Sequence, residues 1–212
     1  MKAKQDIHSI VWLFVLTVLL SISVLSSASD IKPGDPKQVV NNLQMSLLQA
    51  MHEGDQLDYS GRYEFLTPAI DQSHDIDLII RTIIGATLWS DMKLEQQTLI
   101  KDTFRRLSIA TYAGRFIKYG GEQFEIIEQK ELPRDQILVR SRLIKGGDSG
   151  DSVNFDYVLQ QSSGEWRIVN ILFDGVSDLA IKRREYRAIL QRDSFSALIE
   201  MLEEKIVLAE ND

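Results

Sequence analysis

The sequence predicts an α+β fold in which helices come first, a four-stranded antiparallel sheet follows, and further helices close the chain. Two patterns lead to this prediction. Apolar residues recur at helical spacing up to Gly121 and again after Ser177, whereas between these points they alternate with polar residues as in half-buried strands. The length of 212 residues is that of about one domain.

Four helices are predicted before the sheet. The first is marked by apolar residues on one face and by a terminating glycine: Val40, Leu43, Leu47, Met51 and Gly54. A shorter helix carries apolar residues at the same spacing: Tyr63, Leu66 and Ile70. Pro68 is expected to bend or break this second helix, because proline has no N–H for the helical ladder.

The third and fourth helices carry signals at their ends. Asp75 is expected to cap a helix over residues 76–84, with Asp77 in the first turn, where the helix dipole favours a carboxylate. The longest helix is expected to begin near Asp91, with Lys118 in its last turn and Gly120-Gly121 as its stop. Its buried face is predicted to consist of Ile100, Phe104, Leu107, Thr111 and Gly114.

Alternation with a period of two predicts the four strands. On each of three strands, alternating residues share one face of the sheet. These sets are Val139, Ser141 and Leu143, then Val153, Phe155, Tyr157 and Leu159, then Trp166 and Ile168. The turn signals that separate the strands are Leu132-Pro133-Arg134-Asp135, residues 146–150 and Ser162-Ser163-Gly164. After the sheet, Ser177 is expected to cap a helix through Arg192, and Ser194 is expected to cap a last helix that bears Ile206.

The fourth strand is apolar on both faces. Strict alternation places Ile168 and Leu172 on one side, and Val169, Ile171 and Phe173 on the other. Each face must therefore be covered. Either helices pack on both faces and make a solid core, or one face lines an apolar cavity.

The balance of charge and the lack of cysteine exclude several classes of protein. The chain has 31 acidic and 24 basic residues, a formal net charge of −7, whereas nucleic-acid binders carry a basic patch or stripe. Without cysteine, the chain has no thiol nucleophile, no thiolate zinc site and no disulfide. The sequence therefore predicts an acidic globular protein that binds no nucleic acid.

The first 28 residues have the organisation of a secretory signal peptide. Lys2 and Lys4 precede an apolar run over residues 10–25, which ends in the small residues Ser26-Ser27-Ala28-Ser29. Cleavage there predicts a single exported domain over residues 29–212. The alternative is a retained membrane anchor, since the sixteen residues of the run fall just below the roughly 17–25 that span a bilayer.

Two short clusters suggest catalysis or metal binding, and neither interpretation holds. Gly147-Asp148-Ser149-Gly150 resembles the surroundings of a trypsin-type serine, but it lies between two predicted strands, where these are hairpin-turn residues. The other cluster consists of Asp71, His74, Asp75 and Asp77. It lacks metal-binding spacing, and helix capping explains two of its acids. The sequence therefore predicts no catalytic residue, no metal and no cofactor.

A series of motifs carries a resemblance to a known family. The motifs are Ile84-Gly85, Trp89, Gln96-Gln97, Phe104, residues 111–116 (TYAGRF), Tyr119-Gly120, residues 164–170 (GEWRIVN), 174–177 (DGVS) and 186–190 (YRAIL), Leu198-Ile199, Leu202 and Lys205. In this order and spacing, residues 36–206 resemble the MlaC family of periplasmic phospholipid-binding proteins, also called the toluene-tolerance family. Residues 61–70 and 177–180 resemble its hopanoid-biosynthesis-associated HpnM branch. One departure lies at residues 192–195, where Arg-Asp-Ser-Phe stands in place of a usual glycine.

The resemblance implies both a fold and a function. The implied fold is a helical layer wrapped around a twisted antiparallel sheet, with an NTF2/cystatin-like shape and an apolar cavity. The implied function is a carrier in the Gram-negative periplasm that shuttles phospholipid or hopanoid between the inner and outer membranes. The implied partners are an inner-membrane ABC transporter, or an RND-type transporter for the HpnM branch, and an outer-membrane lipoprotein complex.

Apolar residues are the candidates for a lipid-binding wall, because an unpaired polar group that faces acyl carbon is costly. The candidates are Trp89, Phe104, Leu107 and Tyr112 from the helices, and Val139, Leu143, Phe155, Tyr157, Ile168 and Leu172 from the sheet. The sequence leaves open which set on each strand faces the helices. It also leaves open a solid core without a cavity, in which case the protein would be a non-catalytic periplasmic adaptor of a lipid or hopanoid transporter.

Overall fold

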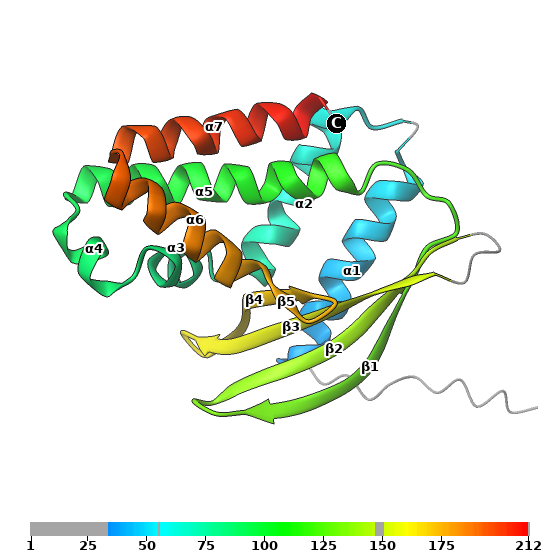
Figure 1. Cartoon of the computed structure of the whole chain (residues 1–212). Helices are drawn as coiled ribbons and strands as arrows, with labels where there is room; N and C mark the ends of the chain where they lie inside the picture. Colours follow the sequence, from blue (N-terminus) through cyan, green and yellow to red (C-terminus); the bar gives the residue numbers. More distant parts are fainter. Residues whose placement is uncertain (1–33, 55, 147–150, 212) are drawn as a thin grey trace, which may run out of the picture. The chain divides into compact units, whose positions relative to one another are not determined.

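The described part of the chain consists of an antiparallel sheet and the helices that pack against it (Figure 1). The computed structural model describes residues 34–54, 56–146 and 151–211. All of them belong to residues 31–212, one of the two units into which the chain divides. The predicted signal peptide, residues 1–28, and the Gly147-Asp148-Ser149-Gly150 cluster lie outside the described residues.

Within these described ranges the chain forms seven helices and five strands. The helices are α1 (Pro36–His52), α2 (Tyr59–Ser73), α3 (Ile76–Ile84), α4 (Ala86–Asp91), α5 (Leu94–Arg115), α6 (Asp178–Arg192) and α7 (Phe195–Asn211). The strands are β1 (Gln123–Leu132), β2 (Gln136–Ile144), β3 (Ser152–Ser162), β4 (Glu165–Phe173) and β5 (Val176–Ser177). No described helix is long and apolar enough to cross a bilayer.

The α+β prediction is confirmed, and the number of strands is corrected from four to five in the described chain. The additional strand, β5, has two residues, and it pairs antiparallel with the end of β4. Two residues are too few to show alternation, so the sequence pattern did not reveal this strand. The likeness to an NTF2/cystatin shape holds only in outline, because the sheet is a plain meander in the order β1-β2-β3-β4-β5.

The predicted helix caps are confirmed at three positions. The Asp75 carboxylate accepts from the N–H of Leu78 at 2.9 Å, and so begins α3. The Ser177 hydroxyl accepts from the N–H of Ala180 at 3.1 Å and begins α6, and Ser194 makes the same contact before α7. Each cap satisfies one of the N–H groups that a first helical turn leaves unpaired.

Two helix predictions need correction. Pro68 was expected to bend or break α2, and it does not break it: the helix and its buried residues Leu66 and Ile70 continue through the proline, since their packing outweighs the loss of one hydrogen bond. The longest helix begins at Leu94, three residues after the expected start near Asp91, but it does not reach Lys118. Residues 86–91 form α4, and the next helix, α5, ends at Arg115, because the following segment turns to bond the end of α1.

A β-bulge decides which residues of β4 face the helices. Leu159 of β3 pairs with Ile168. Tyr157, two residues earlier on β3, pairs with Ile171, three residues further on β4. This extra residue on β4 reverses the alternation, so Ile168 shares its face with Ile171 and not with Leu172. The predicted pairing of Ile168 with Leu172 on one side is therefore wrong.

Buried apolar residues gather in two clusters. The first joins one face of the sheet to α1 and α2 and includes Leu43, Leu66 and Tyr157. The second joins α3, α5, α6 and α7 and includes Ile83 and Leu202. Neither cluster fills the space between the sheet and the middle of α5, and a cavity lies there.

Candidate functional site

A cavity of about 700 Å³ lies between the sheet and helices α5, α6 and α7. Its lining includes Phe155 and Ile168 from the first buried cluster and Phe104 and Leu107 from the second. The cavity therefore occupies the seam between the two clusters. Its volume falls within the roughly 300–1,000 Å³ that small-molecule sites usually have.

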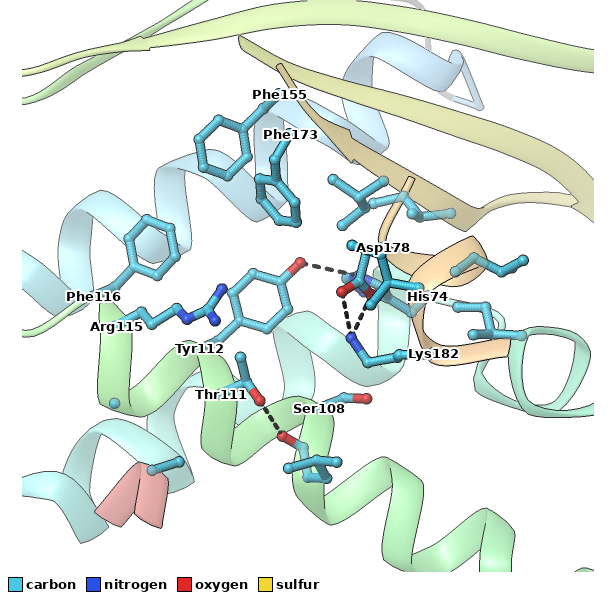
Figure 2. Close-up of a pocket in the computed structure, with 18 of the residues that line it drawn as sticks. His74, Ser108, Thr111, Tyr112, Arg115, Phe116, Phe155, Phe173, Asp178 and Lys182 are labelled. Carbon is cyan, nitrogen blue, oxygen red and sulfur yellow. Dashed lines mark hydrogen bonds and ion pairs between the residues drawn. The ribbon is translucent and has the colours of Figure 1, made fainter. Parts of the chain in front are cut away.

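Aromatic and aliphatic side chains form most of the inner wall (Figure 2). On the sheet side, the rings of Phe155 and Phe173 meet edge to face with centroids 4.9 Å apart. On the helix side, Tyr112 of α5 and Phe116, the residue after its end, stack with centroids 6.0 Å apart. Such a wall offers apolar contacts to a ligand over most of its surface.

Charged side chains also line the cavity, and among them basic groups outnumber acidic ones. The basic residues are Arg115, Lys118, Lys145, Lys182 and Lys205, and the acidic residues are Glu122, Asp178 and Glu185. The first three of the basic set are exposed to solvent and the other charged residues are half-buried, so exposed cations mark the solvent side of the cavity. This excess of positive charge occurs in a chain whose net charge is −7.

Two ion pairs hold part of this charged lining in place. Lys182 Nζ lies 2.5 Å from Asp178 Oδ1, one helical turn earlier on α6. Lys205 Nζ of α7 lies 2.7 Å from Glu185 Oε1 of α6. The second pair connects α6 to α7 and fixes the spacing of the charged groups on these two helices.

One buried polar group, His74, contributes to the inner wall. It follows α2, and the N–H of the next residue, Asp75, donates to the Ile168 carbonyl of β4 at 3.0 Å. The Tyr112 hydroxyl lies 3.2 Å from His74 Nε2 (Figure 2). Burial lowers the pKa of His74 to about 4, so the ring is neutral at pH 7. Burial likewise raises the pKa of the Tyr112 phenol well above its usual value.

Residues 37–204 match the MlaC protein family. The chain belongs to the MlaC family. The toluene tolerance protein Ttg2D of Pseudomonas putida is 21% identical to it over 178 residues, which cover 84% of this chain and 82% of that protein.

A solved structure shares the fold of this MlaC-family chain. It is the phospholipid-binding protein from Ralstonia solanacearum, determined in complex with a phospholipid. The TM-score is 0.69 at 20% sequence identity, over 82% of this chain and 98% of that one. At this identity the likeness establishes the α+β fold alone.

The structure brings six of the ten predicted wall residues of this MlaC-family chain together around the cavity. They are Phe104, Leu107, Tyr112, Leu143, Phe155 and Ile168. Because they come from α5 and three different strands, only the folded chain assembles them. Their predicted contact with lipid stays a prediction.

The other four predicted residues lie outside the cavity lining. Trp89 is on α4, where the Arg81 guanidinium lies over its indole ring, with Arg81 Cζ 5.3 Å from the ring centroid. Val139 and Tyr157 face the helices but are fully buried in the first cluster, beneath α1 and α2. Leu172 faces away because of the bulge in β4.

Several lining residues were missed by sequence reasoning. Strict alternation placed Ile171 and Phe173 on the face of β4 opposite to Ile168, although both line the cavity. Their apolar character was the only feature of the sequence that indicated a place in the wall. Leu179 of α6 and Leu208 of α7 stand on helices whose patterns gave no reason to expect a cavity wall.

The acidic cluster at residues 71–77 is spread over separate partners. Arg105 binds both carboxylate oxygens of Asp71, at 2.6 and 2.5 Å, and Asp77 pairs with Arg81 at 3.0 Å. Asp75 caps α3. Among the described residues, no three His, Asp or Glu side chains are placed to hold a metal ion.

Proposed function

We propose that this MlaC-family protein is a non-catalytic lipid carrier of the periplasm, which holds acyl chains in the cavity between the sheet and α5. The observation that carries the proposal is the cavity itself, about 700 Å³ with an apolar inner wall and charged groups on its solvent side. A lipid has the same division into an apolar and a charged part.

The energy of exposing a lipid to water explains why such a carrier is needed. Each CH₂ group costs about 0.8 kcal/mol to expose, so a sixteen-carbon chain costs on the order of 12 kcal/mol. Unassisted passage through an aqueous compartment is therefore negligible. Rings such as Phe155 and Phe173 at the inner wall replace that contact with water by apolar contact.

The charge of the lining favours a phospholipid as the cargo. A phosphate diester is an anion, and Arg115 and Lys145 are exposed cations at the edge of the cavity. Lysine and arginine bind phosphate through charge-assisted hydrogen bonds. The phospholipid in the related Ralstonia structure supports the same assignment.

The finer parts of the proposal concern export, cargo and partners. Residues 1–28 would direct export and be cleaved, which leaves a single domain over residues 29–212. The carrier would exchange lipid with an inner-membrane ABC transporter and an outer-membrane lipoprotein complex. Should the chain belong to the HpnM branch, the cargo would be a hopanoid and the inner-membrane partner an RND-type transporter.

Native mass spectrometry of the protein purified from its own periplasm tests the proposal, together with extraction and identification of any bound lipid. We expect a stoichiometric adduct of a two-chain phospholipid. A hopanoid adduct would support the carrier function but would show that the cargo is a hopanoid and not a phospholipid.

A clean mass without lipid, unchanged after incubation with phosphatidylethanolamine vesicles, would contradict the carrier. A non-catalytic adaptor of a lipid transporter would then be the better assignment. Added lipid should also raise the unfolding temperature of a carrier, because a ligand that binds only the folded state stabilises it by mass action.

A further inference from the structure

Four polar groups form a continuous hydrogen-bonded series that ends at the cavity wall. The Ser73 hydroxyl lies 2.6 Å from the Ala69 carbonyl and 2.8 Å from His74 Nδ1. His74 Nε2 lies 3.2 Å from the Tyr112 hydroxyl. Tyr112 lines the cavity, so the series connects the interior of α2 to the ligand space.

The position of the Ser73 proton decides the direction of the next hydrogen bond. A carbonyl only accepts, so a hydrogen bond to Ala69 needs the one proton of the Ser73 hydroxyl. We assign the proton to Ala69 because 2.6 Å is the shorter of the two contacts, 2.8 Å separating the Ser73 oxygen from His74 Nδ1, and with this assignment the Ser73 oxygen accepts from His74. His74 Nδ1 consequently carries the ring proton.

The protonation of His74 then fixes the role of Tyr112. The ring is 8% exposed, and burial lowers its pKa to about 4, so at pH 7 it carries one proton in total. That proton is on Nδ1, which leaves Nε2 as an acceptor. The Tyr112 hydroxyl therefore donates its proton to His74, and its oxygen has only lone pairs left for a ligand.

The surroundings of Tyr112 show which part of a lipid would meet this oxygen. Phe116 stacks on Tyr112, and Phe155 and Phe173 lie on the facing side of the cavity (Figure 2). Charged groups share this part of the lining: Arg115 lies beside the Tyr112 ring, and Asp178 is paired with Lys182 at 2.5 Å (Figure 2). The rings of Phe116, Phe155 and Phe173 nevertheless form the apolar wall beside Tyr112, and we expect the hydrocarbon part of a lipid to lie along them.

We propose that the Tyr112 oxygen accepts a hydrogen bond from a hydroxyl group on the hydrocarbon part of the bound lipid, and so selects hydroxylated lipids over otherwise identical ones. Ester carbonyls and ethers offer only lone pairs, so they cannot pair with this oxygen. A hydroxyl buried in an apolar cavity without a partner is costly, whereas Tyr112 supplies the partner. This inference rests on the proposed lipid carrier and names a class of cargo for it.

A competition experiment tests the selection directly. The exported protein is incubated with vesicles that contain equal amounts of dipalmitoyl phosphatidylethanolamine and one analogue with a hydroxyl on a palmitoyl chain, and each hydroxyl position is tested separately. Native mass spectrometry then gives the ratio of the two complexes for each position. For the best-placed hydroxyl we expect about a fivefold preference, the effect of one buried hydrogen bond.

Two variants assign the preference to Tyr112. Tyr112→Phe removes the acceptor and should bring the ratio to about one, with total lipid binding retained. Tyr63→Phe, which removes a tyrosine hydroxyl of α2 outside the cavity lining, should keep the wild-type ratio. If Tyr112→Phe folds poorly, His74→Leu serves instead, since it frees the Tyr112 proton and should reduce the preference.

The outcomes separate this inference from the carrier itself. Equal binding of all the lipids by the wild type would overturn the selection, with a water molecule as the partner of Tyr112, and would leave the carrier intact. A preference that survives in Tyr112→Phe would also overturn it. Failure to bind any of the lipids would overturn the carrier, and the selection with it.

Discussion

Arg187 of α6 lies directly against Gly85, the residue that joins α3 to α4. Its Nε donates to the carbonyls of Ile83 at 3.0 Å and Ile84 at 2.9 Å. These carbonyls end α3 and have no N–H partner within the helix. The guanidinium satisfies them and also places a cation at the negative end of the helix dipole. Glycine suits this position because φ is 88°, and a Cβ at residue 85 would also force the guanidinium to move.

Gly85→Ala is therefore expected to destabilise the protein by about 2–3 kcal/mol. Gly85 has φ 88° and ψ 154°, a conformation open almost only to glycine, and alanine would in addition displace Arg187. Urea denaturation measures the change. Gly164→Ala is the control, because Gly164 has φ 85° but open space around it, and backbone strain alone should cost about 1 kcal/mol. Equal losses in the two variants would show that the contact with Arg187 does not matter.

Gln44→Leu tests a buried polar contact between α1 and the sheet. Gln44 Nε2 donates to the Ser141 hydroxyl at 2.8 Å, and that hydroxyl donates to the Phe155 carbonyl at 2.9 Å. Leucine keeps the volume but leaves the buried Ser141 oxygen without its donor, which should cost about 1–2 kcal/mol of unfolding free energy. Gln49→Leu, at an exposed position of α1, should change it by less than about 0.5 kcal/mol. A Gln44 variant as stable as the Gln49 variant would contradict the prediction.

The buried His74 should make stability depend on pH. Burial lowers its pKa to about 4, while a hydrogen bond to the Ile70 backbone and the Asp178 carboxylate oppose this shift. In the unfolded chain the pKa is about 6.5. Between pH 6.5 and 4 the unfolded state therefore binds a proton at His74 that the folded state does not bind. The stability contribution is complete above pH 6.5 and is lost as the pH falls toward 4, by up to about 3 kcal/mol.

Urea denaturation at pH 7 and pH 4.5 measures this loss by comparison of variants. His74→Phe should lose less stability between the two pH values than the wild type does, whatever its stability at pH 7. His52→Asn is the matched control, because His52 is exposed at the end of α1. An unchanged pH dependence in His74→Phe would show that His74 does not titrate as described.

Thr111→Trp tests whether the cavity is the binding space. Thr111 lines the cavity from α5, so an indole there would occupy space that a lipid chain needs (Figure 2). Overpacking costs about 1–3 kcal/mol, which corresponds to lipid binding about ten- to hundredfold weaker. Leu99→Trp, on an exposed position of the same helix, should bind as the wild type does. Fluorescent phospholipid titration measures both, and undiminished binding by a folded Thr111→Trp would place the lipid elsewhere.

The sequence pattern determined the type and order of most elements. Asp75, Ser177 and Ser194 are short polar residues directly before apolar helical runs, and each begins a helix through its own side chain. This information is local, because a cap acts within three residues along the chain. Alternation located the four long strands for the same reason.

Tertiary contacts decided which residues form the cavity. The bulge in β4 arises from pairing with β3, and it exchanged Leu172 for Ile171 on the inward face. Val139 and Leu143 lie on the same face of β2, yet α1 and α2 bury the first while the second lines the cavity. Periodicity cannot distinguish them, since both residues have the same parity.

The sequence by itself thus determined the α+β class, the caps of the helices, the acidic charge and the apolar character of the central strands. Only the tertiary structure decided that the two buried clusters leave a cavity between them and that the Tyr112 hydroxyl lies within hydrogen-bond distance of His74 at its wall. The physical reason is the distance along the chain between the residues that interact. Caps and alternation depend on neighbours a few residues apart, whereas the cavity depends on how helices from both ends of the described chain pack against one sheet.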